Sequence, residues 1–167
     1  MNSAFIMPCG ALLMLSASAI AQQHPACTGP LLGTWVLLSM ETEDMETGEK
    51  NNLLGAHPSG YLSYGPDCRM SAILVKESRA APRALVPTDA ESIELYRGLI
   101  SYAGSYAIDG SRVIHHIEAS WNQAWTATSQ AFQFRVDGKS LFMMTGPGKS
   151  PLTGRESSSV LIWTKVE

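Results

Sequence analysis

The sequence contains few charged side chains and no excess of basic residues. Charged residues make up 16% of its 167 positions, against about 25% in typical soluble domains, which suits a chain with many buried positions rather than a disordered one. The net charge is −3, whereas nucleic-acid-binding domains usually carry a clustered basic face. The sequence therefore predicts one globular domain that does not bind nucleic acid.

Motifs that identify several enzyme and nucleotide-binding classes are also missing. The chain has no G-x-S-x-G nucleophile elbow. Residues 146–150, Gly-Pro-Gly-Lys-Ser, resemble a phosphate-binding loop only superficially, because they lack the G-x-x-x-x-G-K-[ST] spacing between a strand and a helix. We therefore expect no cofactor.

The first 21 residues contain no charged side chain. Their apolar centre, residues 11–15, is shorter than the roughly 20 residues that span a bilayer, and an A-x-A-like triplet of small residues follows it. Although no Lys or Arg precedes the apolar centre, we expect residues 1–21 to be a secretory signal peptide cut before Gln22; an N-terminal membrane anchor is the alternative. Residues 22–30 then form a polar lead-in and residues 31–167 the domain. We expect a secreted or periplasmic protein without stable membrane insertion after cleavage.

The sequence has only three cysteines. Cys9 would leave with the signal peptide, so Cys27 and Cys68 remain as an even pair in an oxidising compartment. They are candidates for a disulfide that ties the N-terminal segment to the first hairpin, and two unpaired thiols are the alternative.

Short strand-like segments separated by turn residues dominate the remaining chain. Asp109-Gly110 and Asp137-Gly138 are typical of tight hairpin turns, and the charged stretch at residues 41–50 ends the first strand. The eight expected strands cover residues 32–40, 61–64, 69–76, 102–108, 112–120, 129–136, 139–145 and 157–166.

One helix is expected after the third strand. Thr88 can serve as its N-cap, and Glu91 three residues later completes a capping box. Ile93 and Tyr96, with residues 99–100, fall on one apolar face at helical spacing.

This pattern predicts an all-β fold, an eight-stranded antiparallel up-and-down barrel with one helix inserted after the third strand. Closure removes exposed strand edges, and eight strands leave an interior that is filled by side chains or holds one small ligand. A β-sandwich is the alternative.

Two adjacent histidines, His115 and His116, lie in an apolar strand. Successive side chains of a strand point to opposite faces, so the two rings cannot bind one ion together. His115 shares the more apolar face and is expected inside, whereas His116 and Glu118 share the solvated face. We expect no metal site. An interior His115 is either a hydrogen-bonded core residue or a group that binds a ligand or transfers protons.

Other polar and aromatic side chains could join His115 in the interior. Tyr102 and Tyr106 share one face of their strand. Arg135 lines the interior unless the neighbouring Phe residues face inward, in which case it lies on the surface. Trp125 belongs to a link between strands and could cap a pocket mouth.

Several short motifs resemble those of the bacterial and fungal lipocalin-like domain family of small calycin-type barrels. They occur in the family's order and cover roughly residues 31–165. The motifs are Leu32-Gly33-Thr34-Trp35, Pro58-x-Gly60-Tyr61-Leu62-x-Tyr64, Tyr102-x-Gly104-x-Tyr106, Val113-x-His115, Trp125, Phe134-Arg135 and Leu161-x-Trp163.

This resemblance implies an eight-stranded barrel with a cavity for a small apolar or aromatic molecule, and a tryptophan, Trp35, near the barrel base. It also favours His115 and Arg135 as recurring polar positions, together with Tyr102 and Tyr106. Members commonly have Asp-Gly-x-Met where this chain has Asp-Cys-Arg-Met at residues 67–70, a departure that bears on the hairpin turn and on the disulfide.

These observations lead to a secreted or periplasmic protein that binds a small hydrophobic molecule through His115, Tyr102, Tyr106, Arg135 and Trp125. A cofactor-free isomerase, cyclase or lyase that uses His115 with Tyr106 or Arg135 is the alternative. A third possibility is an interaction module with a filled barrel.

Overall fold

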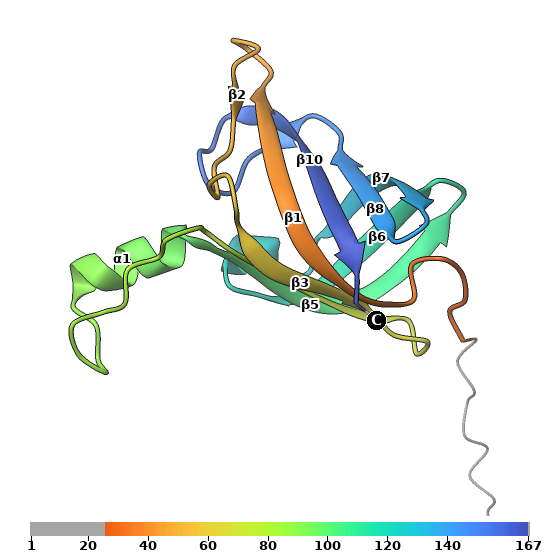
Figure 1. The fold of residues 1–167 in the computed structure, drawn as a ribbon, viewed down its shortest axis with the longest axis horizontal. Helices are drawn as coiled ribbons and strands as arrows, with labels where there is room; N and C mark the ends of the chain where they lie inside the picture. The colour runs from red at the N-terminus through yellow and green to blue at the C-terminus, as the bar shows by residue number, and fades with distance from the viewer. Residues whose placement is uncertain (1–25, 167) are drawn as a thin grey trace, which may run out of the picture.

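The computed structural model describes residues 26–166, which form a closed barrel of eight antiparallel strands (Figure 1). Each barrel strand pairs with the next one along the chain, and the first pairs with the last. The barrel strands are β1 (Gly33–Asp44), β3 (Ser59–Tyr64), β4 (Arg69–Val75), β5 (Leu99–Asp109), β6 (Arg112–Ser120), β7 (Ser129–Asp137), β8 (Ser140–Thr145) and β10 (Glu156–Lys165). The predicted barrel is therefore confirmed, with its helix after the third barrel strand.

Four smaller elements lie in the connections between barrel strands. They are β2 (Lys50–Asn51), α1 (Asp89–Arg97), the 3-10 helix η1 (Gln123–Trp125) and β9 (Gly148–Lys149). The short strands β2 and β9 pair with β1 and β10, respectively. No helix within residues 26–166 is both long enough and apolar enough to cross a bilayer.

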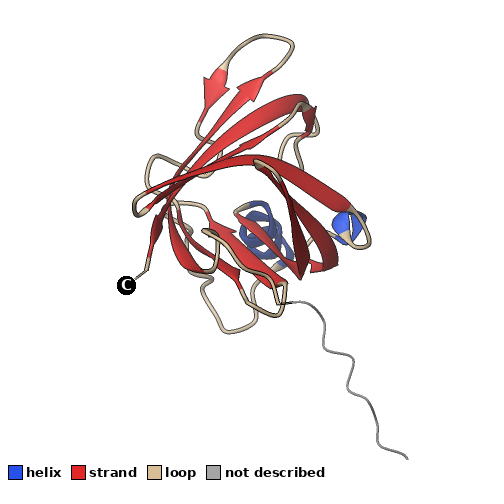
Figure 2. Cartoon of the chain, turned by 90° about the vertical axis from the view of Figure 1, so that its right-hand side faces the viewer, coloured by secondary structure: helices blue, strands red, loops and turns tan. Residues whose placement is uncertain are grey.

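The two ends of the barrel differ in the length of their connections, and Figure 2 shows the strands wrapped around the interior. Three short hairpin loops close one end, at residues 65–68, 110–111 and 138–139. The opposite end carries the four longer connections, at residues 45–58, 76–98, 121–128 and 146–155. We call the end with these longer connections the open end, because long loops at one end of a rigid barrel can line a binding site.

Strand β1 is longer than the sequence indicated, because it continues through the charged residues to Asp44. A bulge at Leu38 shifts the pairing with β10 and turns Leu38 to solvent. After the bulge, Thr42 and Asp44 face inward, and the Thr42 hydroxyl lies 2.9 Å from that of Ser159 on β10. The prediction that the strand ends at residue 40 is wrong, because pairing with β10 and β2 keeps residues 41–44 extended, and the chain turns only after Asp44.

Helix α1 begins at the predicted capping box, but the prediction that one apolar face of the helix extends to residues 99–100 is wrong. The Thr88 hydroxyl accepts a hydrogen bond from the Glu91 backbone, and the Glu91 carboxylate accepts one from the Thr88 backbone. The helix ends at Arg97 and buries no residue, and it projects away from the barrel (Figure 1). Residues 99–100 belong instead to β5, where pairing with β4 outweighs the helical spacing.

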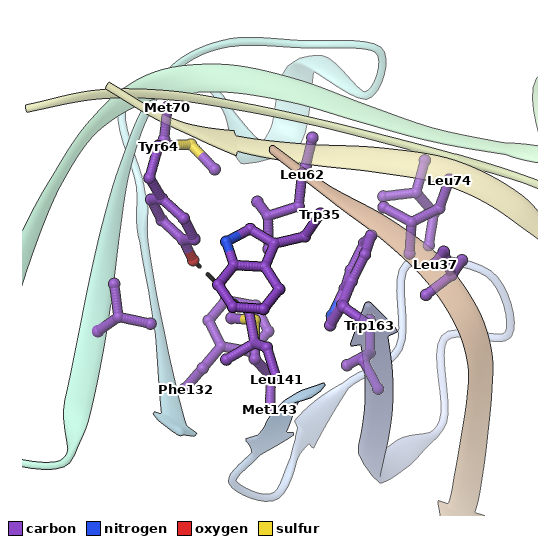
Figure 3. Close-up of a cluster of buried hydrophobic side chains, with 14 of the residues drawn as sticks. Trp35, Leu37, Leu62, Tyr64, Met70, Leu74, Phe132, Leu141, Met143 and Trp163 are labelled. Carbon is purple, nitrogen blue, oxygen red and sulfur yellow. Dashed lines mark hydrogen bonds between the residues drawn. The ribbon is translucent and has the colours of Figure 1, made fainter. Parts of the chain in front are cut away.

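The barrel interior is filled mainly by the inward-facing residues of alternating strand positions (Figure 3). Trp35 is fully buried, and its indole N–H donates a 2.8 Å hydrogen bond to the Leu31 carbonyl oxygen. Because residue 31 precedes β1, this bond fastens the incoming chain across the closed end. The expected position of Trp35 near the barrel base agrees with this packing.

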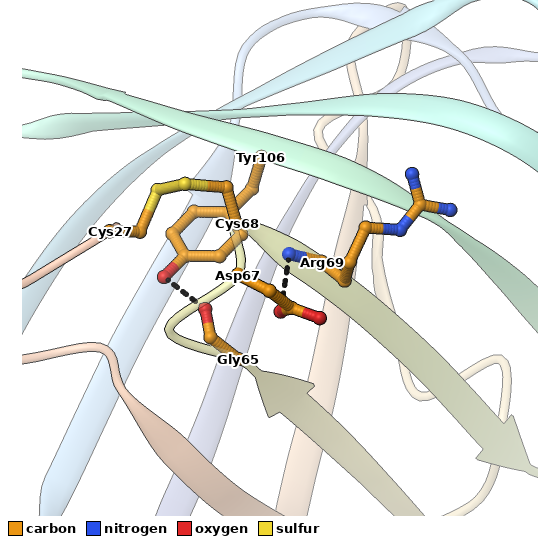
Figure 4. Close-up of a disulfide and its surroundings, with 6 residues drawn as sticks. All are labelled: Cys27, Gly65, Asp67, Cys68, Arg69 and Tyr106. Atoms are coloured by element: carbon orange, nitrogen blue, oxygen red, sulfur yellow. Dashed lines mark hydrogen bonds between the residues drawn. A yellow bond between two sulfur atoms is a disulfide. The ribbon is translucent and has the colours of Figure 1, made fainter. Parts of the chain in front are cut away.

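A disulfide joins Cys27 to Cys68 beside the closed end (Figure 4). Cys68 lies in the β3–β4 hairpin with φ of 62°, a conformation that glycine adopts far more readily than other residues. Cys68 holds this backbone conformation in the turn, and its amide donates a hydrogen bond to the Gly65 carbonyl oxygen. The covalent bond thus fastens the N-terminal segment to the barrel across 41 residues of sequence.

Strands β5 and β6 approach each other closely at Gly104, beside the strand segment that carries His115. The pairing shifts by one residue between Ala103 and Gly104. A Cβ atom at Gly104 would lie only 1.9 Å from the His116 carbonyl oxygen. Only glycine fits there without a backbone shift.

Candidate ligand-binding cavity

An internal cavity of about 110 Å³ lies at the open end of the barrel. Apolar side chains from seven barrel strands form most of its wall, and Trp125, Gly146 and residues 148–152 contribute at the mouth. The wall residues within the barrel strands are Met40, Leu62, Leu74, Ile100, Tyr102, His115, Gln130, Phe132, Met143, Thr145, Ser157, Ser159, Leu161 and Trp163. An apolar cavity of about 150 Å³ can hold benzene, so this cavity, which opens at its mouth, approaches the size that a single ring needs.

His115 lies in the cavity wall and is fully buried. Strand alternation on β6 turns it inward together with Val113 and Ile117, whereas His116 faces solvent. The structure therefore confirms the predicted split of the histidine pair. The imidazole ring also packs against Phe132 on β7, with 4.8 Å between ring centroids.

Two tyrosine hydroxyls bind the two ring nitrogens of His115. The Tyr64 oxygen lies 2.7 Å from Nε2, and the Tyr102 oxygen lies 3.1 Å from Nδ1. A neutral imidazole has one donor and one acceptor nitrogen, so one tyrosine donates to the ring and the other accepts from it. Both ring nitrogens are engaged within the protein.

Burial keeps this tyrosine–histidine–tyrosine group uncharged. Desolvation lowers the pKa of His115 to about 3, with a smaller contribution from His116. Desolvation also raises the pKa of Tyr64 and of Tyr102 well above the usual range. At neutral pH this part of the cavity wall therefore carries no charge.

Aromatic rings form the wall next to the mouth. Trp125 meets Tyr102 edge-on, with 5.6 Å between ring centroids, and meets Trp121 edge-on at 5.1 Å. The side chain of Asn122 caps η1 by accepting a bond from the Ala124 amide, which holds the short helix in place. Trp125 thus lies at the pocket mouth, as its position between strands suggested.

Tyr106 lies on the same face as Tyr102 but outside the cavity. It packs edge-on against Tyr64, with 4.8 Å between ring centroids. Its hydroxyl donates a 3.1 Å hydrogen bond to the Gly65 carbonyl oxygen, next to the disulfide (Figure 4). Tyr106 lies four residues further along β5 than Tyr102 and therefore nearer the closed end. There it supports the β3–β4 hairpin.

Arg135 lies on the outer surface of the barrel, which corrects the expectation that it lines the interior. The Phe132 side of β7 faces inward, so Arg135 points outward. Its guanidinium group donates to the Asp137 carboxylate at 3.1 Å and lies 4.4 Å from the centre of the Phe142 ring. His115, Tyr106 and Arg135, the residues suggested for catalysis, are therefore not assembled around one space.

His116 and Glu118 point to solvent on the outer face of β6, as predicted. Nδ1 of His116 lies 2.9 Å from the Ser129 hydroxyl. Glu118 accepts two hydrogen bonds from Arg69, at 2.6 and 2.7 Å, and this pairing lowers the pKa of its carboxyl group. Their partners lie on β7 and β4, respectively.

Sequence reasoning missed two residues that matter for the cavity, Tyr64 and Trp163. Each belonged to a motif of the resemblance, but neither was chosen as a site residue. Tyr64 is two residues from Leu62, and Trp163 is two residues from Leu161, so each pair shares one face of its strand. Strand alternation alone was therefore a signal that both aromatic residues face inward with these leucines.

The family comparison covers the whole barrel. A model of the family described as the lipocalin-like domain matches residues 32–166, a range that includes all eight barrel strands. No curated protein matched the chain, and no solved structure matched it either. The closed barrel, the single helix between β4 and β5 and the family match agree with one another, and a barrel of this kind is consistent with small-molecule binding. The chain belongs to the lipocalin-like domain family.

Proposed function

We propose that this protein binds one small hydrophobic or aromatic molecule inside the barrel. The observation that supports this most directly is the cavity of about 110 Å³ at the open end, with a mostly apolar wall and a few convergent polar groups. Sites with this composition are typical of small-molecule binding. The volume is below the roughly 300 Å³ of pockets for larger ligands, so a single-ring compound is the best fit.

The geometry supports binding rather than catalysis. Both nitrogens of His115 are engaged by tyrosines, and burial keeps the pKa of the ring near 3. A general base at neutral pH needs a pKa near the working pH and access to the substrate proton. His115 has neither property here, so its role is to shape the polar wall of the cavity.

We further propose that the protein works outside the cytoplasm. The apolar N-terminal 21 residues and the Cys27–Cys68 disulfide support export, since disulfides persist in oxidising compartments. Expression of the full chain followed by cell fractionation and intact-mass measurement tests this. An exported product that begins at Gln22 supports the proposal, and a full-length cytoplasmic protein contradicts it.

Ligand binding can be tested with toluene as the probe and NMR shifts of the protein as the readout. We expect saturable shifts of signals from the cavity wall. Leu161→Trp should abolish them, because Leu161 faces the cavity and the larger ring would fill it. Val160→Trp is the matched control, because Val160 is the next residue on β10 and is 39% exposed on the outer face.

Toluene binding that is equal in the two variants would contradict a site in the barrel. The absence of any saturable binding by toluene and similar single-ring compounds would contradict the proposed function itself. A folded state of each variant, checked by the dispersion of its NMR spectrum, makes either result interpretable.

A further inference from the structure

The indole nitrogen of Trp163 is buried without a hydrogen-bond partner. Trp163 is 2% exposed, and its Nε1 atom has no acceptor within the described residues. Trp35, the other fully enclosed tryptophan, donates its N–H to a backbone carbonyl. Buried indole N–H groups usually find an acceptor, so Trp163 is an exception that calls for a cause.

Trp163 lies in the wall of the cavity. It lines the cavity together with Leu161, which lies two residues away on the same face of β10. Figure 3 shows its indole among the interior side chains rather than on the outer face of the barrel. Three other buried polar atoms of the described chain lack partners, in Arg79, Trp121 and Thr126, and none of these residues lines this cavity.

Several other polar groups of the wall already have partners. Tyr102 and His115 bond to each other. The Thr145 hydroxyl accepts a 2.8 Å hydrogen bond from the Ser159 amide, and the Ser159 hydroxyl lies 2.9 Å from that of Thr42. The indole is a donor that cannot accept, so a ligand that bonds to it must supply an acceptor.

The wall also indicates the charge of a suitable ligand. Of the residues that line the cavity, only Lys149 carries a charge at neutral pH, and it is exposed on β9 at the mouth. A carboxylate placed deep in the barrel would lose its hydration without meeting a cation, which is unfavourable. A neutral oxygen acceptor meets the indole N–H without that cost.

We propose that the ligand is a compact, uncharged ring compound with a carbonyl oxygen, and that this oxygen accepts a hydrogen bond from the Trp163 indole. An aromatic or cyclic ketone has the required size and chemistry. This inference rests on the proposed function, because it names the class of molecule that the same cavity binds.

Two isosteric probes separate the hydrogen bond from apolar packing. Acetophenone has the carbonyl group, and α-methylstyrene has a CH₂ group in place of the oxygen. Trp163→Phe keeps an aromatic ring and removes the N–H, and we expect it to weaken acetophenone binding about tenfold while changing α-methylstyrene binding less than twofold. Trp125→Phe, at the mouth, is the matched control and should leave the ratio of the two affinities unchanged.

The wild-type protein provides a readout that needs no variant to fold. In a ¹H–¹⁵N spectrum, acetophenone should shift the indole N–H signal of Trp163 downfield, whereas α-methylstyrene should not. Benzoate should bind at least tenfold more weakly than acetophenone, because its charge meets no buried cation.

Each remaining outcome has a distinct meaning. Equal binding of both probes, with no downfield indole shift, would overturn the hydrogen bond and leave the proposed function standing; an indole that donates only to a trapped water would give this result. Benzoate binding as tight as that of acetophenone would overturn the uncharged class. Failure of all three probes to bind would overturn the proposed function as well.

Discussion

The buried ring of His115 should make a distinct contribution to the acid destabilisation of this barrel. The folded-state pKa of the ring is about 3, whereas an unperturbed histidine titrates near 6.5. Between these values the unfolded chain binds a proton that the folded barrel does not, so the free energy of unfolding falls as the pH falls. The slope approaches about 1.4 kcal/mol per pH unit, which amounts to roughly 2.7 kcal/mol between pH 7.5 and 4.5.

Urea unfolding of three proteins at pH 7.5, 5.5 and 4.5 measures this effect. His115→Gln keeps a polar side chain between Tyr64 and Tyr102 but cannot titrate, so it should be less stable than wild type at pH 7.5. Carboxyl groups titrate in both proteins, and their contribution cancels in the difference. We expect the stability gap between wild type and His115→Gln to shift by about 2.7 kcal/mol in favour of the variant at pH 4.5.

His116→Gln is the matched control, because His116 is the adjacent residue and is exposed on the outer face. Its gap from wild type should change much less over the same pH range. Parallel pH profiles for wild type and His115→Gln would refute the reasoning. They would show that His115 takes up its proton over the same pH range in the folded and the unfolded protein.

Three further perturbations test the closed end, the β5–β6 contact and the mouth. Replacing both cysteines by serine should cost up to about 4 kcal/mol in urea unfolding, because the disulfide closes a loop of 41 residues; combining Cys27→Ser with Cys68→Gly should cost about 1 kcal/mol less, since glycine adopts the positive φ without strain. Gly104→Ala should cost about 2 to 3 kcal/mol in the same assay, because its Cβ would meet the His116 carbonyl oxygen. Trp125→Ala should weaken toluene binding in an NMR titration by up to about tenfold, because it removes the aromatic wall beside Tyr102.

Each of these predictions has its own contradiction. Equal stabilities of the two cysteine double variants would show that the left-handed conformation at Cys68 carries no cost. Gly146→Ala is the control for Gly104→Ala, because nothing lies within 4 Å of its Cβ position, and an equal loss in both would argue against the clash. Unchanged toluene affinity in Trp125→Ala would remove this residue from the site.

Patterns local to one strand allowed several features to be predicted from the sequence. Alternation placed His115 inward and His116 outward, and the capping box marked the start of α1. These features depend on neighbouring residues of one segment and on the fixed side-chain period of that segment, so no knowledge of distant contacts was needed. The tight turns and the count of barrel strands followed in the same way.

Other features depended on contacts between strands far apart in the sequence. Barrel closure extended β1 through a charged stretch, and pairing with β4 drew residues 99–100 out of the expected helix. Arg135 faces solvent because β7 buries its phenylalanine side, a choice that the sequence had left open. Periodicity alone cannot decide such cases, because both alternatives have the same local spacing.

The sequence by itself determined a barrel of the lipocalin-like type and an interior histidine. Only the tertiary structure decided what that histidine does, because Tyr64 reaches it from 51 residues away and Tyr102 from a neighbouring strand. The same holds for Trp163, whose inward position was readable but whose lack of a partner was not. Bulges and strand registers set which side chains lie at the same height in the barrel, and that height decides which groups bond to each other and which face the cavity.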